Sequence, residues 1–66
     1  MDIVLFTTRN PKCRALERKL IEKDIRHTEI TDMNEIAKFG ITDTPVLKVG
    51  DELMGYDKAL EWAMRM

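Results

Sequence analysis

The sequence predicts a small α/β protein in which strands and helices follow one another in the order βαβαββα. Short apolar or β-branched runs alternate with segments whose apolar residues recur at helical spacing. The last two runs are separated only by Gly50 and Asp51, a pair typical of a tight hairpin turn. A chain of 66 residues has room for one hydrophobic core, so residues 1–66 are expected to form a single domain.

The first two elements are a buried strand and an amphipathic helix. Residues 2–6 form a short, nearly continuous apolar run, as expected for a strand covered on both faces. The segment that follows, to about residue 24, carries Cys13, Leu16 and Leu20 at positions i, i+3 and i+7. This spacing predicts a helix with these three residues on one stripe facing the sheet.

The middle of the chain predicts a second strand and a short helix. Residues 26–30 alternate weakly, and a strand joined to the first by a helix should pair with it in parallel. His27, on the edge of that strand, is expected to face solvent. Thr31 or Asp32 can cap a short helix that Gly40 ends.

The remaining elements are a hairpin and a last helix. Residues 45–49 and 52–54 are the two predicted strands of the hairpin. Asp57 is a favourable N-cap and is expected to begin the last helix.

The turn between the first strand and first helix contains the only cysteine of the chain. Asn10 is a good N-cap and Pro11 fits the first helical position, which places Cys13 in the first helical turn. Unpaired N–H groups and the positive end of the helix dipole favour a thiolate, the reactive form, and Arg9 and Lys12 add positive charge nearby. Cys13 also lies on the apolar stripe, where a free cysteine often packs as a small hydrophobic residue. Both interpretations stand on the residues alone.

Four segments together resemble the glutaredoxins and related small redoxins of the thioredoxin superfamily. They are the turn ending in Cys13, Gly40-Ile41-Thr42, Thr44-Pro45 at the head of a strand, and Gly55-Tyr56-Asp57 after the hairpin. The resemblance spans nearly the whole chain and implies a minimal thioredoxin-like fold, with a four-stranded mixed sheet and helices on both faces. It also implies a cis peptide bond at Thr44-Pro45, facing the cysteine turn.

The resemblance implies a binding site as well. Backbone beside the proline would hold an extended peptide or glutathione by strand-like pairing. The implied substrate-binding residues are Thr44, Pro45, Gly55, Tyr56 and Asp57, beside an active-site turn made of Arg9, Asn10, Pro11 and Lys12, with Cys13 as the catalytic residue.

The chain departs from the family at Asn10, where small redoxins carry the attacking cysteine. The spacing from Cys13 to Ile25, with Leu20 midway, is similar to that of the second, resolving cysteine of these proteins. The rival alignment treats Cys13 as the first cysteine of a monothiol motif and shortens the helix by about one turn, or about 5 Å. We prefer the first alignment.

Two functions follow from these features. One is thiol–disulfide exchange through the single Cys13, with glutathione as a possible co-substrate or with another protein's disulfide or thiol as partner. The other is a redox-inactive protein that keeps the proline face as a peptide- or partner-binding module. The chain is an enzyme under the first of these two functions and not under the second.

Composition and charge exclude several other classes of function. Eleven basic and 12 acidic residues nearly cancel and are interspersed along the sequence, which argues against nucleic-acid binding. The longest apolar run is far too short to span a membrane, and the N-terminus begins directly with a strand pattern. One cysteine and one histidine give no metal-ligand spacing. We therefore expect a cytoplasmic monomer without a bound cofactor or metal.

Overall fold

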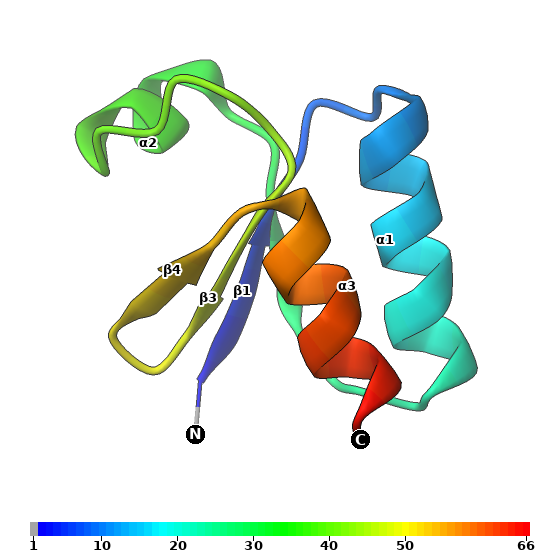
Figure 1. The fold of residues 1–66 in the computed structure, drawn as a ribbon. Helices are drawn as coiled ribbons and strands as arrows, with labels where there is room; N and C mark the ends of the chain where they lie inside the picture. Colours follow the sequence, from blue (N-terminus) through cyan, green and yellow to red (C-terminus); the bar gives the residue numbers. More distant parts are fainter. Residues whose placement is uncertain (1) are drawn as a thin grey trace.

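The computed structural model describes residues 2–66 and has the predicted order of elements (Figure 1). The strands are β1 (Ile3–Phe6), β2 (Thr28–Ile30), β3 (Val46–Val49) and β4 (Glu52–Met54), and the helices are α1 (Pro11–Glu22), α2 (Met33–Lys38) and α3 (Tyr56–Met64). Each observed element lies within two residues of its predicted bounds.

The four strands form one mixed sheet in the order β2-β1-β3-β4. β1 pairs in parallel with β2 and antiparallel with β3, and β3 and β4 form the predicted hairpin. Gly50 turns the hairpin with a positive φ of 60°, a conformation that glycine adopts without steric cost. This arrangement confirms the expected α/β fold with a minimal thioredoxin-like topology.

Helices lie on both faces of the sheet, but they cover the faces unequally. α1 and α3 lie side by side over one face, whereas α2 is short and sits near one end of the sheet on the other side (Figure 1). Phe39, at the end of α2, packs against Phe6 of β1 with their ring centroids 5.0 Å apart. Asp32 caps α2 by accepting a hydrogen bond from the N–H of Asn34 at 2.8 Å, which selects it over Thr31.

The hydrophobic core lies between the sheet and the α1–α3 layer. Its buried members are Leu5, Leu16, Leu20, Leu47, Met54, Ala59 and Ala63. Alternation along β1 and β3 brings one set of side chains to this face, and the predicted stripe of α1 supplies the other. Cys13 is equally buried but does not belong to this cluster.

Two predictions were wrong. Asp57 is not the N-cap of the last helix, because α3 begins at Tyr56, two residues earlier than a cap at Asp57 would place it, and Gly55 is the N-cap without a side-chain bond. Asp57 lies instead in the first turn, where its negative charge interacts favourably with the helix dipole. His27 does not face solvent: only 9% of its side chain is exposed.

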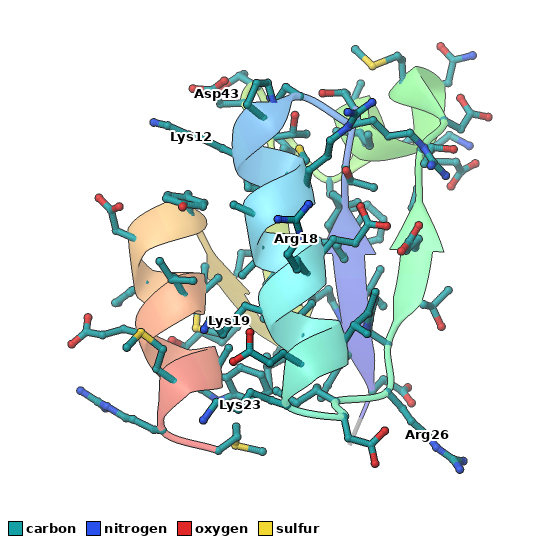
Figure 2. The ribbon with its side chains drawn as sticks, turned by 90° about the vertical axis from the view of Figure 1, so that its right-hand side faces the viewer. Lys12, Arg18, Lys19, Lys23, Arg26 and Asp43 are labelled. Carbon is teal, nitrogen blue, oxygen red and sulfur yellow. The ribbon has the colours of Figure 1, made fainter. Side chains whose placement is uncertain are left out.

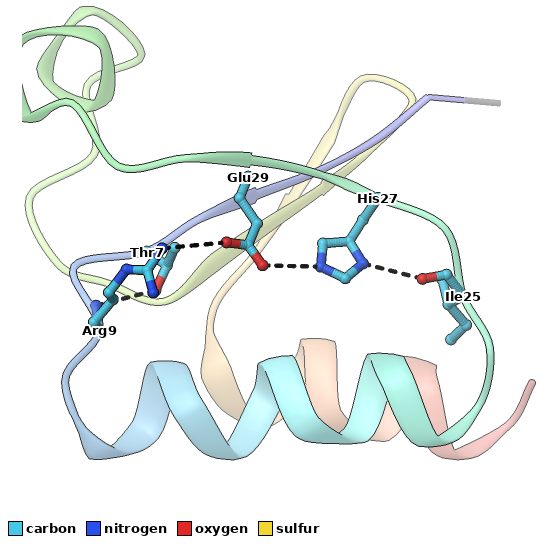
Figure 3. A network of polar contacts seen from close by, with 5 residues as sticks. All are labelled: Thr7, Arg9, Ile25, His27 and Glu29. Carbon is cyan, nitrogen blue, oxygen red and sulfur yellow. Dashed lines mark hydrogen bonds and ion pairs between the residues drawn. The ribbon is translucent and has the colours of Figure 1, made fainter.

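The position of His27 explains its burial. Its Nδ1 atom lies 3.0 Å from the carbonyl oxygen of Ile25, and its Nε2 atom lies 3.5 Å from the carboxylate of Glu29 (Figure 3). Glu29 in turn pairs with Arg9 at 3.9 Å. The imidazole is therefore held against the sheet by a polar chain of contacts rather than directed outward.

Candidate functional site

The turn before α1 has the predicted helix-start geometry. Asn10 is the N-cap, with an extended backbone, and its Oδ1 atom accepts a hydrogen bond from the N–H of Cys13 at 2.8 Å. Pro11 occupies the first helical position, where its missing N–H costs nothing. Cys13 is consequently fixed at N3, in the first turn of the helix.

The loop leading to this turn is held in a constrained conformation. Arg9 has a positive φ of 63°, which is uncommon for a residue with a side chain. Its N–H donates to Thr7 Oγ1 at 3.1 Å (Figure 3). The N–H of Thr7 in turn donates to the carbonyl of Ile30 at 3.0 Å. These bonds join the loop to the end of β2 and set the direction of the Arg9 side chain toward Glu29.

The proline loop faces the cysteine turn, as expected. The Thr44-Pro45 peptide bond is cis. Asn10 Nδ2 donates to the carbonyl oxygen of Thr44 at 3.3 Å, and the hydroxyl groups of Thr8 and Thr44 lie 2.7 Å apart. Asn10 thus caps α1 with one amide atom and bridges to the proline loop with the other.

Polar groups surround the thiol of Cys13. Burial acts to raise the pKa of this thiol and is the largest single influence on it. Hydrogen bonds from the Thr7 side chain, the Thr8 backbone, the Thr44 side chain and the Asn10 backbone act in the opposite direction. Together they prevail, so the pKa of Cys13 lies below its usual value of 9.0.

Thr7 is the most telling of these neighbours because it is fully buried. Its oxygen already accepts a hydrogen bond from the Arg9 N–H, which leaves its single hydroxyl proton free to be donated elsewhere. A buried hydroxyl needs a partner, and a thiolate is a strong acceptor in such a position. No pattern in the sequence indicates this position of Thr7, since a threonine after a strand has no characteristic spacing.

A shallow groove of about 320 Å³ runs past the turn. It is lined by Asn10, Lys12, Asp43, Thr44, Pro45, Val46, Gly55 and Tyr56. The Lys12 ammonium lies 5.6 Å from the centroid of the Tyr56 ring, so one charged and one aromatic side chain meet at the edge of the groove.

The groove brings together most of the predicted site residues. Arg9, Pro11 and Asp57 do not line it, and neither does Cys13, which lies beneath the turn with no exposed surface. Asp43 and Val46 were missed, although both adjoin the Thr44-Pro45 pair in sequence. Chemically, the groove offers backbone and amide groups for an extended ligand, while the thiol below it is reached only if the turn moves.

Among residues 2–66, no helix combines the length and the apolar composition that a membrane span requires. In the same residues, no three histidine, cysteine or acidic side chains form a group that could hold a metal ion.

Comparison with protein-family models, with curated proteins and with solved structures found no match to this chain. The fold itself therefore defines the class to which the structure can be assigned: a small α/β protein with a minimal thioredoxin-like arrangement.

Proposed function

We propose that this chain is an atypical glutaredoxin-like protein that carries out thiol–disulfide exchange through Cys13 alone. The observation that carries this proposal is the polar surroundings of the thiol. A cysteine that served only as a small hydrophobic residue would gain nothing from three threonines and a helix N-terminus, whereas a thiolate gains from each.

The exchange consists of two displacements. The Cys13 thiolate attacks one sulfur of a glutathione-containing or protein disulfide, forming a mixed disulfide while the other sulfur leaves as a thiolate. Glutathione, or a thiol of the partner, then attacks the mixed disulfide and regenerates Cys13. No second cysteine of the chain can perform that step, because Cys13 is the only one.

Access to the thiol requires the turn to open. The amide of Asn10 is bonded to Thr44 across the mouth of the turn. A single hydrogen bond of this kind contributes only about 1 kcal/mol, so a ligand that competes for the Thr44 carbonyl could displace it. The groove beside Pro45 would bind that ligand as an extended strand, as the resemblance implies.

The direct test is formation of a mixed disulfide with glutathione. Native protein is incubated with oxidised glutathione across a pH series, and the intact mass of the product is measured. We expect one glutathione to be added to the wild type, faster as the pH rises through the pKa of Cys13, and none to be added to Cys13→Ser. Absence of the adduct in folded protein, with rapid formation after unfolding, would contradict redox activity.

A second test concerns the position of Asn10. The Oδ1 atom of Asn10 lies 2.8 Å from the backbone nitrogen of Cys13, so a sulfur at residue 10 would lie close to the Cys13 side chain. Asn10→Cys should therefore close an intramolecular disulfide under mild oxidant and reduce insulin, which the wild type should not do without glutathione. Two free thiols in folded, oxidised protein would instead favour the monothiol alignment.

A redox-inactive binding module is the second candidate, and the complete burial of Cys13 favours it. In this case the groove would bind a peptide and the thiol would never react. Tyr56→Ala would then weaken peptide binding, while Cys13→Ser would leave it unchanged.

A further inference from the structure

The basic residues are not evenly distributed in the folded chain. Residues 9–26, which comprise α1 and the loops at its two ends, contain seven basic and three acidic residues, a net charge of +4. The rest of the sequence contains four basic and nine acidic residues, a net charge of −5. The net charge of −1 is the sum of these two values, so the side of the molecule formed by α1 and its flanking loops is basic although the whole chain is not.

A trough runs along the outer side of α1 within this basic region. Two adjoining hollows, of about 460 and 360 Å³, are both bordered by Arg9, Arg14 and Arg18. The two hollows share these three arginines as lining residues, and together they are called the trough below. Figure 2 shows the α1 side of the molecule, with Arg18 partway along the helix. Ile21, with 68% of its surface exposed, lines the end of the trough farther from the cysteine turn.

Two of the three arginines have no ion-pair partner among residues 2–66. Arg9 is paired with Glu29 at 3.9 Å, although 63% of its side chain remains exposed. Arg14 and Arg18 form no ion pair with any of residues 2–66. They are four positions apart on one helix, where like charges repel each other. An anion placed between them would relieve this repulsion and satisfy both guanidinium groups.

We propose that this trough binds an acidic segment of a partner protein in an extended conformation. Side chains at alternate positions of an extended peptide lie about 7 Å apart, close to the rise of about 6 Å between Arg14 and Arg18. Two carboxylates at such positions match two guanidinium groups, each of which can form a bidentate pair. An apolar side chain farther along the segment would contact Ile21.

The acidic residues of the trough favour a peptide over a nucleic acid. Glu17 lines the trough and faces Glu29 of β2. Desolvation and the nearby Glu29 raise the pKa of Glu17, while Arg9 and His27 act to lower it. A continuous phosphate backbone would meet repulsion from these carboxylates, whereas a peptide can carry its charges only where the arginines are.

This inference does not depend on the chemistry of Cys13. The trough and the groove beside Pro45 lie on different sides of the turn and share no lining residue. An acidic segment in the trough would bring a partner next to the turn whether or not the thiol reacts.

Binding can be measured by fluorescence anisotropy with a labelled ten-residue peptide that carries glutamate at alternate positions and one leucine. The paired variant Arg14→Gln/Arg18→Gln removes the two unpaired arginines. The matched control, Lys23→Gln/Arg26→Gln, removes the same charge from the basic side, near the other end of α1 (Figure 2). A peptide with glutamine in place of glutamate, a labelled single-stranded DNA of equal length and the Cys13→Ser variant complete the set.

We expect the first pair of substitutions to weaken peptide binding about tenfold or more, and the control pair to weaken it by less than about threefold. Cys13→Ser should bind as the wild type does, even if glutathione addition is lost or was never present. Equal losses in the two paired variants would overturn the proposal, because they would show attraction by overall charge alone. Binding of the DNA as tightly as the acidic peptide, or no binding of the peptide at low salt, would overturn it as well.

Discussion

The two ends of the buried stripe of α1 have different surroundings. Cys13 at one end and Leu20 at the other are both fully buried and lie on the same side of the helix. Leu20, with Leu16, belongs to the apolar cluster between the sheet and α3. Cys13 lies outside that cluster, beneath the proline loop and among hydroxyl and amide groups.

Burial alone therefore does not identify a core residue. The leucines stabilise the domain by removing apolar surface from water, at about 25 cal/mol per Å². The cysteine is buried at a place where the chain supplies hydrogen-bond donors to the thiol, and the effect is a lower thiol pKa. One helix thus contributes apolar packing along most of its length and, in its first turn, places a thiol among hydrogen-bond donors.

The largest expected effect is on stability, and it should differ between the two ends of the stripe. Leu16→Ala should reduce the free energy of unfolding by about 2–5 kcal/mol, because it opens a cavity in the apolar cluster. For so small a domain this is much of the total stability. Cys13→Ala should cost only about 1 kcal/mol. Guanidinium unfolding followed by circular dichroism measures both, and Leu16→Met, which conserves volume, serves as the control. Equal losses at residues 13 and 16 would place Cys13 in the core after all.

The next prediction concerns the bridge that closes the polar end. Asn10→Ala removes both the cap bond to the Cys13 N–H and the bond to Thr44, and should cost about 1–2 kcal/mol. Asn10→Ser keeps an oxygen for the cap but loses the donor to Thr44, and should cost less. Both variants should react faster than wild type with iodoacetamide in the folded state. If Asn10→Ser protects the thiol as well as asparagine does, the contact with Thr44 does not restrict access.

The difference between the two ends also explains which features of the fold and the site could be predicted from the sequence. The stripe of Cys13, Leu16 and Leu20 and the capping preference of Asn10 are local properties, and both were predicted correctly. The groove followed from the resemblance in its main residues, including the cis bond at Pro45.

What the sequence could not provide is the environment created by contacts between distant segments. Thr7 and Thr44 are 37 residues apart, and only the pairing of β1 with β3 brings them to the same thiol. His27 was misplaced for a different reason: its partners Ile25 and Glu29 are only two residues away, but the weak alternation of residues 26–30 did not show on which side of the strand the imidazole lies. The N-cap of the last helix was misplaced by two residues, from Gly55 to Asp57, since Gly55 is also an acceptable N-cap and gives no competing side-chain signal.

A smaller effect should appear in the pH dependence of stability. The pKa of Cys13 is lowered in the folded protein, so in the interval between the folded and unfolded values the unfolded chain binds more protons. The wild type should therefore become more stable relative to Cys13→Ser as the pH rises through this interval. The gain should be complete above the usual thiol value of 9.0 and be lost as the pH falls through the folded value. The difference is measured from the guanidinium unfolding midpoints of both proteins, at on the order of five pH values between pH 6 and 10. The contributions of all other titrating groups cancel in this difference. A constant difference would mean that the polar surroundings do not favour the thiolate.

The smallest expected effect lies at the edge of the groove, where Lys12 lies over Tyr56 at 5.6 Å. At such an exposed position the interaction contributes about 0.5–1 kcal/mol, so Lys12→Gln should reduce stability by no more than that, and Lys12→Arg should retain it. Tyr56 is the only tyrosine of the chain, so its ring protons give an isolated signal in an NMR spectrum. These signals should shift on Lys12→Gln and change little on Lys12→Arg, because an ammonium or guanidinium group over the ring polarises it and an amide does so far less. Unshifted signals in Lys12→Gln would show that the lysine is solvated away from the ring. The edge of the groove would then be formed by the aromatic side chain alone, and a ligand bound beside Pro45 would meet no positive charge there.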